Sequence, residues 1–176
     1  MVKFTDEHKK ERSMNYFDEG VHPVLIESLE FGTTEKGQEF AEFNVIDPDD
    51  DDRKGVARVW FTTDSAIGFS INVLRGIAVH NAKTDADKEK VKAAFIKMGD
   101  TTDLAKIADK FRGMEAWYVV EKSDNTYTNS AGEVKSSYNR NVYGYEPKPK
   151  APSSVDKVVE ATGGEQVDIN PSEFPF

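Results

Sequence analysis

The sequence contains no cysteine, so disulfide bonds, thiolate catalysis and zinc sites with a cysteine ligand are excluded. Its three histidines, His8, His22 and His80, lie far apart in the chain and form no paired metal-binding motif. A phosphate-binding glycine loop, a Gly-x-Ser-x-Gly motif and other catalytic signatures are also missing. We therefore expect a protein that is not an enzyme and that needs no metal or cofactor.

Long apolar runs are missing as well. No segment approaches the roughly 18 consecutive apolar residues of a membrane helix, and residues 1–20 are too charged for a secretory signal peptide. We therefore expect a cytoplasmic protein. Its 176 residues suffice for one domain with a buried core and a tail. The formal net charge of −9 is unusual for a nucleic-acid-binding protein, because such domains are usually basic.

Alternation of apolar and polar residues predicts three β-strands after an N-terminal arm at 1–20. The strands are expected at 21–31, 39–46 and 56–61, with turns at 32–38 and 47–55. In the second and third strands the alternation directs Phe40, Arg58 and Trp60 outward. The inward-facing residues of these two strands are expected to be Ala41, Phe43, Val45, Val59 and Phe61.

The acidic run at 47–52 suggests a calcium-binding loop. An EF-hand needs glycine at loop position six and glutamate at position twelve, and counting from Asp47 these positions hold Asp52 and Arg58. The motif therefore fails. A solvated hairpin turn explains the run better, because aspartate and proline favour turns.

Helical spacing of apolar residues follows the third strand. The three stripes run from Ile67 to Ala78, from Val91 to Met98 and from Leu104 to Phe111. We expect Thr63, Asp64 or Ser65 to cap the first helix, and Thr101 or Thr102 to cap the third.

Two more strands and a connecting loop complete the ordered part of the chain. The strands are expected at 114–122 and 136–145, and the polar loop between them at 123–135. Glu115 and Glu121 share parity with Trp117, so we expect Trp117 to face outward and Tyr118 to face the core.

Three strands, a helical insertion and two further strands are the layout of a five-stranded Greek-key barrel of the OB type. The expected fold is therefore mainly β, with the barrel domain at 21–145. In such a barrel the ligand lies across strands two and three, between the loops that join strands one to two and four to five. Aromatic side chains mixed with cations there are typical of a platform for single-stranded nucleic acid, and they also fit ordinary surface aromatics of a sandwich edge. The candidate nucleic-acid-binding residues are Lys36, Phe40, Arg58, Trp60, Trp117, Lys122, Tyr127, Lys135, Tyr138, Arg140 and Tyr143.

Residues 146–176 have a different composition from the rest of the chain. A Pro/Lys/Ser-rich stretch leads into a polar, acidic segment, and the low apolar content predicts a disordered tail. The tail ends in Phe174, Pro175 and Phe176, and a disordered segment cannot bury two aromatic rings by itself. Together with Asp168 and Glu173, these residues are expected to bind a basic-rimmed apolar pocket of a partner protein. The alternative is a frayed terminus whose phenylalanines pack back on the barrel.

The run from Gly20 to Gly76, with TTEKGQEFAEFNVID and KGVARVWFTTDSA, resembles bacteriophage single-stranded DNA-binding proteins of the OB fold. The tail resembles the C-terminal tip of bacterial single-stranded DNA-binding proteins, with more widely spaced carboxylates. This resemblance implies non-sequence-specific binding of single-stranded DNA in phage DNA replication or recombination, in the host cytoplasm. It also implies that the tail recruits replication or recombination proteins. A non-DNA interaction module and a phage structural or assembly protein remain alternatives.

Overall fold

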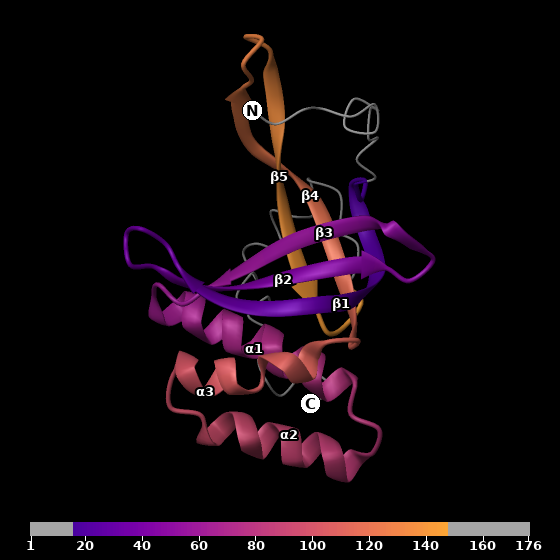
Figure 1. The fold of residues 1–176 in the computed structure, drawn as a ribbon, viewed down its shortest axis with the longest axis vertical. Coiled ribbons are helices and arrows are strands. Elements are labelled where there is room, and N and C mark those ends of the chain that lie inside the picture. Colours follow the sequence, from indigo (N-terminus) through magenta and orange to yellow (C-terminus); the bar gives the residue numbers. More distant parts are fainter. Residues whose placement is uncertain (1–15, 148–176) are drawn as a thin grey trace, which may run out of the picture.

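The computed structural model describes residues 16–147. Within this range, five strands and three α-helices follow one another, with the helices between the third and fourth strands as expected (Figure 1). The strands are β1 (Gly20–Thr33), β2 (Glu39–Asp47), β3 (Asp50–Trp60), β4 (Glu115–Thr128) and β5 (Val134–Tyr143). The helices are α1 (Asp64–His80), α2 (Asp85–Lys97) and α3 (Thr101–Lys106), followed by the 3-10 helix η1 (Ala108–Phe111).

The five strands form one antiparallel sheet in the order β3–β2–β1–β4–β5. β1 connects its two halves, because the first part of β1 pairs with β4 and the second part pairs with β2. The register of β1 with β2 shifts between Ile26 and Ser28, next to the point where β1 changes partner. β3 and β5 are the two edges and are not paired with each other, so the sheet is open. The mainly β fold is confirmed, whereas a closed Greek-key barrel is not.

The core lies where the alternation of β2 and β3 predicts it. Ala41, Phe43 and Val45 of β2 are fully buried, and Val59 of β3 is almost fully buried. Tyr118 of β4 is also buried, which confirms the expected orientation of this strand. The predicted N-terminal arm contributes to the same core, because Phe17 is buried with its ring centroid 5.0 Å from that of Tyr118.

All three predicted helical segments are present, with corrections at the second and third. Helix α2 begins at Asp85, before the predicted stripe, and the third segment divides into α3 and the 3-10 helix η1. Thr63 caps α1 as expected, its hydroxyl accepting a hydrogen bond from the Ala66 N–H at 3.2 Å. The cap of α3 is Asp100, and the prediction of Thr101 or Thr102 is wrong. The Asp100 carboxylate accepts from the backbone N–H groups of both Thr102 and Asp103, at 2.8 Å and 3.2 Å. Asp100 therefore satisfies two amides that lack partners within the helix.

The predicted loop at 123–135 is mostly strand, so this prediction is wrong. β4 continues to Thr128 and β5 begins at Val134, which leaves a turn of only five residues. The Asn129 side-chain oxygen accepts from the N–H groups of Ala131 and Glu133, at 3.0 Å and 2.9 Å, and Gly132 adopts a positive φ of 79°. These features close a tight turn. The hairpin extends beyond the rest of the sheet (Figure 1). Both of its faces are therefore exposed to solvent, which explains why a paired strand here has the polar composition of a loop.

The predicted turn at 47–55 is also shorter in the structure. Only Pro48 and Asp49 separate β2 from β3, so most of the acidic run belongs to a strand. The Asp47 side chain accepts from the Asp49 N–H at 2.9 Å, and it forms an ion pair with Arg53 at 3.3 Å. Aspartate therefore stabilises this hairpin locally, as expected of a turn former.

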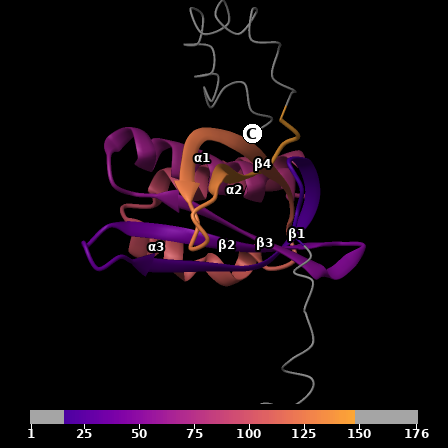
Figure 2. The ribbon, with the colours of Figure 1, turned by 90° about the horizontal axis from the view of Figure 1, so that it is seen from above.

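Helix α1 packs against the end of β5 at a contact between two glycines. A Cβ placed on Gly144 would lie 2.3 Å from the backbone carbon of Gly76, so Gly144 tolerates no side chain without a shift of the backbone. Figure 1 shows the three helices below the sheet, and Figure 2 shows the strands lying over them. Within residues 16–147, no helix has both the length and the apolar character needed to cross a membrane.

Candidate nucleic-acid interface

Aromatic and cationic side chains cluster on the outer face of β2 and β3. Phe40 and Trp60 are directly opposite each other in the sheet, with ring centroids 5.5 Å apart and planes tilted by 52°. The Arg58 guanidinium lies 4.5 Å from the centroid of the Phe40 ring, within cation–π distance. Phe40 and Trp60 are half-buried and Arg58 is exposed. We call Phe40, Arg58 and Trp60 the outer cluster.

The positive charge of the outer cluster is partly neutralised by Glu42. Glu42 is the cross-strand neighbour of Arg58, and its carboxylate accepts from the Arg58 Nε at 2.6 Å. The side chains of Arg58 and Glu42 are 47% and 22% exposed, so the pair lies at the solvent boundary. A phosphate that binds Arg58 must therefore compete with this carboxylate. Sequence reasoning missed Glu42, although it lies two residues from Phe40 on the same face.

A groove separates the outer cluster from β5. It has a volume of about 380 Å³ and is bounded by β3, β5 and the first half of α1. Arg58 and Trp60 line its β3 side, and Arg140 lines its β5 side. The structure thus brings together three of the predicted residues from strands that are about 80 positions apart in the chain. We call this cavity the β3–β5 groove.

A second and larger cavity, of about 550 Å³, shares Arg140 with the β3–β5 groove. Lys54, Gly55 and Val56 of β3 line it, together with Tyr118 of β4. The Tyr118 hydroxyl donates to the Val56 carbonyl at 3.1 Å. Burial raises the pKa of Tyr118, and the charge of Arg140 acts in the opposite direction. Tyr118 therefore stays a neutral donor at physiological pH.

The β4–β5 hairpin carries further predicted residues as cross-strand pairs. Lys122 is opposite Tyr138, and Tyr127 is opposite Lys135, so each pair places a cation beside an aromatic ring on one face. All four side chains are exposed. Lys135 forms an ion pair with Glu133 at 3.0 Å, whereas Lys122 has no ion pair within the described residues. Tyr127 lies in a strand, so its expected position in a loop is wrong.

Three predicted residues lie elsewhere. Trp117 is half-buried, as its predicted outward orientation allows, and it lines a different pocket beside Pro23. Tyr143 packs edge-on against Phe69 of α1, with ring centroids 6.4 Å apart, and burial raises its pKa to about 12. Lys36 is exposed in the connection between β1 and β2 and lines neither groove. The structure gives Tyr143 in particular a packing role.

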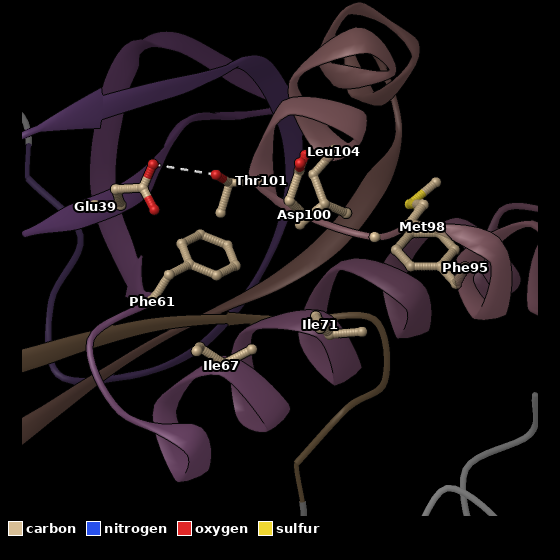
Figure 3. Close-up of a pocket in the computed structure, with 10 residues that line it drawn as sticks. Glu39, Phe61, Ile67, Ile71, Phe95, Met98, Asp100, Thr101 and Leu104 are labelled. Carbon is tan, nitrogen blue, oxygen red and sulfur yellow. Dashed lines mark hydrogen bonds between the residues drawn. The ribbon is translucent and has the colours of Figure 1, made fainter.

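An apolar pocket of about 280 Å³ lies between the sheet and the three helices (Figure 3). Phe61 points into it from the end of β3, and Ile67 and Ile71 approach from α1. The Thr101 hydroxyl donates to the Glu39 carboxylate at 3.1 Å. No lysine or arginine lines this pocket, so its chemistry does not suit a phosphate.

Within residues 16–147, no group of three or more His, Asp or Glu side chains could hold a metal ion. The predicted partner-binding residues of the tail lie outside the described residues. No protein-family model matches the chain, and no curated protein matches it either. A functional assignment therefore depends on the geometry of the grooves and the outer cluster.

Proposed function

We propose that this protein binds single-stranded DNA without sequence specificity, as a binding protein of a replication or recombination system rather than as an enzyme. The observation that supports this most directly is the outer cluster, where two aromatic rings and a guanidinium lie beside a groove with Arg140 on its far side. Exposed bases stack on aromatic rings, and cations beside them bind the phosphates that connect those bases. The outer cluster and the β3–β5 groove offer both kinds of contact.

We also propose that the sheet is a partly open OB-type barrel. Bringing the edges of β3 and β5 together would give the ring β1–β2–β3–β5–β4, and the two strands do lie close to each other. The Tyr118 hydroxyl already bridges to the β3 edge at Val56. Gly55 makes this approach possible, because a Cβ there would lie 2.7 Å from the Tyr118 ring. In OB-type barrels the face of strands two and three binds oligonucleotides.

The net charge of −9 is compatible with this proposal because charge acts locally. Asp50 and Trp60 are the two ends of β3, so at about 3.3 Å per residue they lie about 30 Å apart. The Debye length is about 8 Å at physiological salt, so the acidic hairpin is screened from the outer cluster. The tail holds six acidic residues against three lysines, so it also carries part of the negative charge.

The tail is proposed to recruit a replication or recombination protein. Phe174 and Phe176 provide apolar area for a partner, and Pro175 restricts the backbone between them, which lowers the cost of ordering on binding. Glu173 and Asp168 favour a pocket rimmed by arginine or lysine.

Binding of oligo(dT) and of duplex DNA, measured side by side at several salt concentrations, tests the proposed function. We expect gel shift and fluorescence titration to show tighter binding of the single strand, with an affinity that falls as salt rises. No binding of oligo(dT) at low salt, or equal binding of both forms, would contradict it.

The apolar pocket favours one alternative, a module that binds another protein. Its Phe61, Ile67 and Ile71 side chains would accept an apolar side chain, while Glu39 and Asp100 at its border would favour a neighbouring basic residue. This alternative predicts that the protein does not bind oligo(dT). It also predicts that substitution of Ile71 abolishes binding of the partner protein, whereas substitution of Trp60 does not.

A further inference from the structure

Two asparagines line the β3–β5 groove, and sequence reasoning did not select either of them. Asn139 and Asn141 are two residues apart on β5, so their side chains lie on the same side of the strand. The side chain of Arg140, between them, lies on the other side, where its charge acts on Tyr118. Trp60 lines the β3 side of the groove, and Phe69 and Ser70 contribute from α1. The groove therefore has an aromatic wall on one strand and an amide-bearing wall on the other.

The amides of Asn139 and Asn141 have no hydrogen-bond partner among the described residues. Other asparagines of the same fold are used structurally. Asn81, for example, donates to the carbonyls of Ile77 and Glu115, at 2.8 Å and 2.9 Å, and accepts from the Glu115 N–H. The two groove amides are thus available to a ligand, each with two donors and one acceptor.

The position of Trp60 is set from two sides. The Ser70 hydroxyl donates to the Trp60 carbonyl at 2.7 Å, which ties the end of β3 to α1. The Trp60 ring contacts Phe40 on the outer face. The hydrogen bond fixes the backbone of Trp60 and the contact with Phe40 restricts its ring, so the residue loses little freedom when a ligand stacks on it.

These features select a class of ligand. A phosphate would use only the donors of the amides, and an apolar side chain would leave both amides without partners. An unpaired nucleobase has a flat face for Trp60 and an edge with neighbouring donors and acceptors for the amides. A base in a duplex has its pairing edge occupied.

We propose that the β3–β5 groove is a slot for one unpaired nucleobase, which stacks on Trp60 and is held through its edge by Asn139 and Asn141. This inference rests on the proposed function, to which it adds a contact with the edge of a base. The amide can turn to present either its donors or its acceptor, so the slot suits a protein that accepts different bases.

The test compares two probes of about 15 nucleotides, a length near the upper site size of one OB-type barrel. One probe is oligo(dT), and the other is an abasic oligodeoxynucleotide with the same phosphates and no bases. The variant is Asn139→Ala/Asn141→Ala. Asn125→Ala is the matched control, because Asn125 is an exposed asparagine of the same hairpin that lines neither groove. Thermal unfolding by circular dichroism checks each variant.

We expect the double variant to bind oligo(dT) about fivefold more weakly, the scale of one net hydrogen bond of about 1 kcal/mol, and to bind the abasic probe as wild type does. Asn125→Ala should bind both probes as wild type does. Asn141→Leu keeps a similar side-chain volume without adding a charge, removes the amide donors and acceptor, and should also lose affinity for oligo(dT) only. An equal loss for both probes, or no loss for either, would overturn the slot while leaving the proposed function intact. If wild type binds no oligo(dT), the proposed function and the slot both fail.

Discussion

The β2–β3 strands and the β4–β5 hairpin share antiparallel pairing and a mixture of aromatic and cationic side chains, but they differ in what lies beneath them. Under the outer cluster, Phe43 and Val59 are buried in the core. At the hairpin tip, Tyr127 is 55% exposed and the neighbouring residues of β4 are exposed as well. A rigid support suits a stacking platform, whereas an unsupported hairpin suits adaptable contacts with a flexible strand.

The largest expected difference between the two regions is in stability. Phe43→Ala should lower the free energy of unfolding by about 3–5 kcal/mol, because it removes a fully buried ring. Tyr127→Ala should change it by no more than about 0.5 kcal/mol. Urea unfolding followed by circular dichroism measures both values. A loss of several kcal/mol in Tyr127→Ala would show that the hairpin is supported by packing after all.

The next largest effect is expected at the platform. Trp60→Ala should weaken binding to oligo(dT) by about 1–3 kcal/mol, the scale of one stacked base. Tyr138→Ala on the hairpin should cost less, since no core residue holds its ring in place. Fluorescence anisotropy with a labelled oligonucleotide gives both affinities. Equal losses of affinity in the two variants would mean that the outer cluster and the β4–β5 hairpin contribute alike to DNA binding.

The two arginines are expected to differ in their contribution to salt dependence. Arg140→Ala should reduce the slope of log affinity against log salt by about 0.7, the share of one phosphate on a single strand. Arg58→Ala should reduce it by less, because Glu42 already neutralises part of its charge. Titrations at four salt concentrations give the slopes. The opposite ranking would mean that Glu42 releases Arg58 on binding.

Removal of the competing carboxylate should have a smaller effect in the opposite direction. Glu42→Gln is expected to tighten binding of oligo(dT) by up to about 1 kcal/mol, the upper range for an exposed ion pair. Anisotropy at low salt is the measurement, and Glu89→Gln is the control, since it breaks an ion pair with Lys92 on helix α2 and lines neither groove. Weaker binding by Glu42→Gln would mean that the ion pair between Arg58 and Glu42 has a structural role and does not compete with the DNA.

The smallest effect on DNA is expected from the tail. Deletion of residues 174–176 should leave the affinity for oligo(dT) near that of wild type, because the tip carries no cation or platform residue. The same deletion should abolish capture of a replication or recombination protein in a pull-down from host or phage-infected lysate. Identical partner sets for the intact and shortened proteins would remove the proposed role of the tip.

Local patterns predicted the orientation of side chains well, and long-range geometry explains the misses. Alternation correctly assigned Phe43 and Tyr118 to the buried face of their strands, and Phe40 and Trp117 to the outer face. A strand with one buried face leaves a clear period of two in the sequence. The same pattern fails where neither face is buried, which is why the polar hairpin was expected to be a loop.

The composition of the groove was harder to predict than the strands that form it. The Arg58–Glu42 pair depends on the register between β2 and β3, and the slot depends on β3 meeting β5. Neither relation is visible in a local pattern. Asn139 and Asn141 resemble any solvated asparagines until the fold places them opposite Trp60.

The central claim is that bases stack at Trp60, and the two tryptophans of the chain allow a direct test. Trp117→Phe leaves Trp60 as the only tryptophan, and Trp60→Phe leaves Trp117. Titration with oligo(dT) should quench the fluorescence of Trp117→Phe strongly and that of Trp60→Phe very little, because Trp117 lines a separate pocket. Strong quenching in Trp60→Phe together with an unresponsive Trp117→Phe would place the DNA at the pocket beside Trp117 and contradict the account.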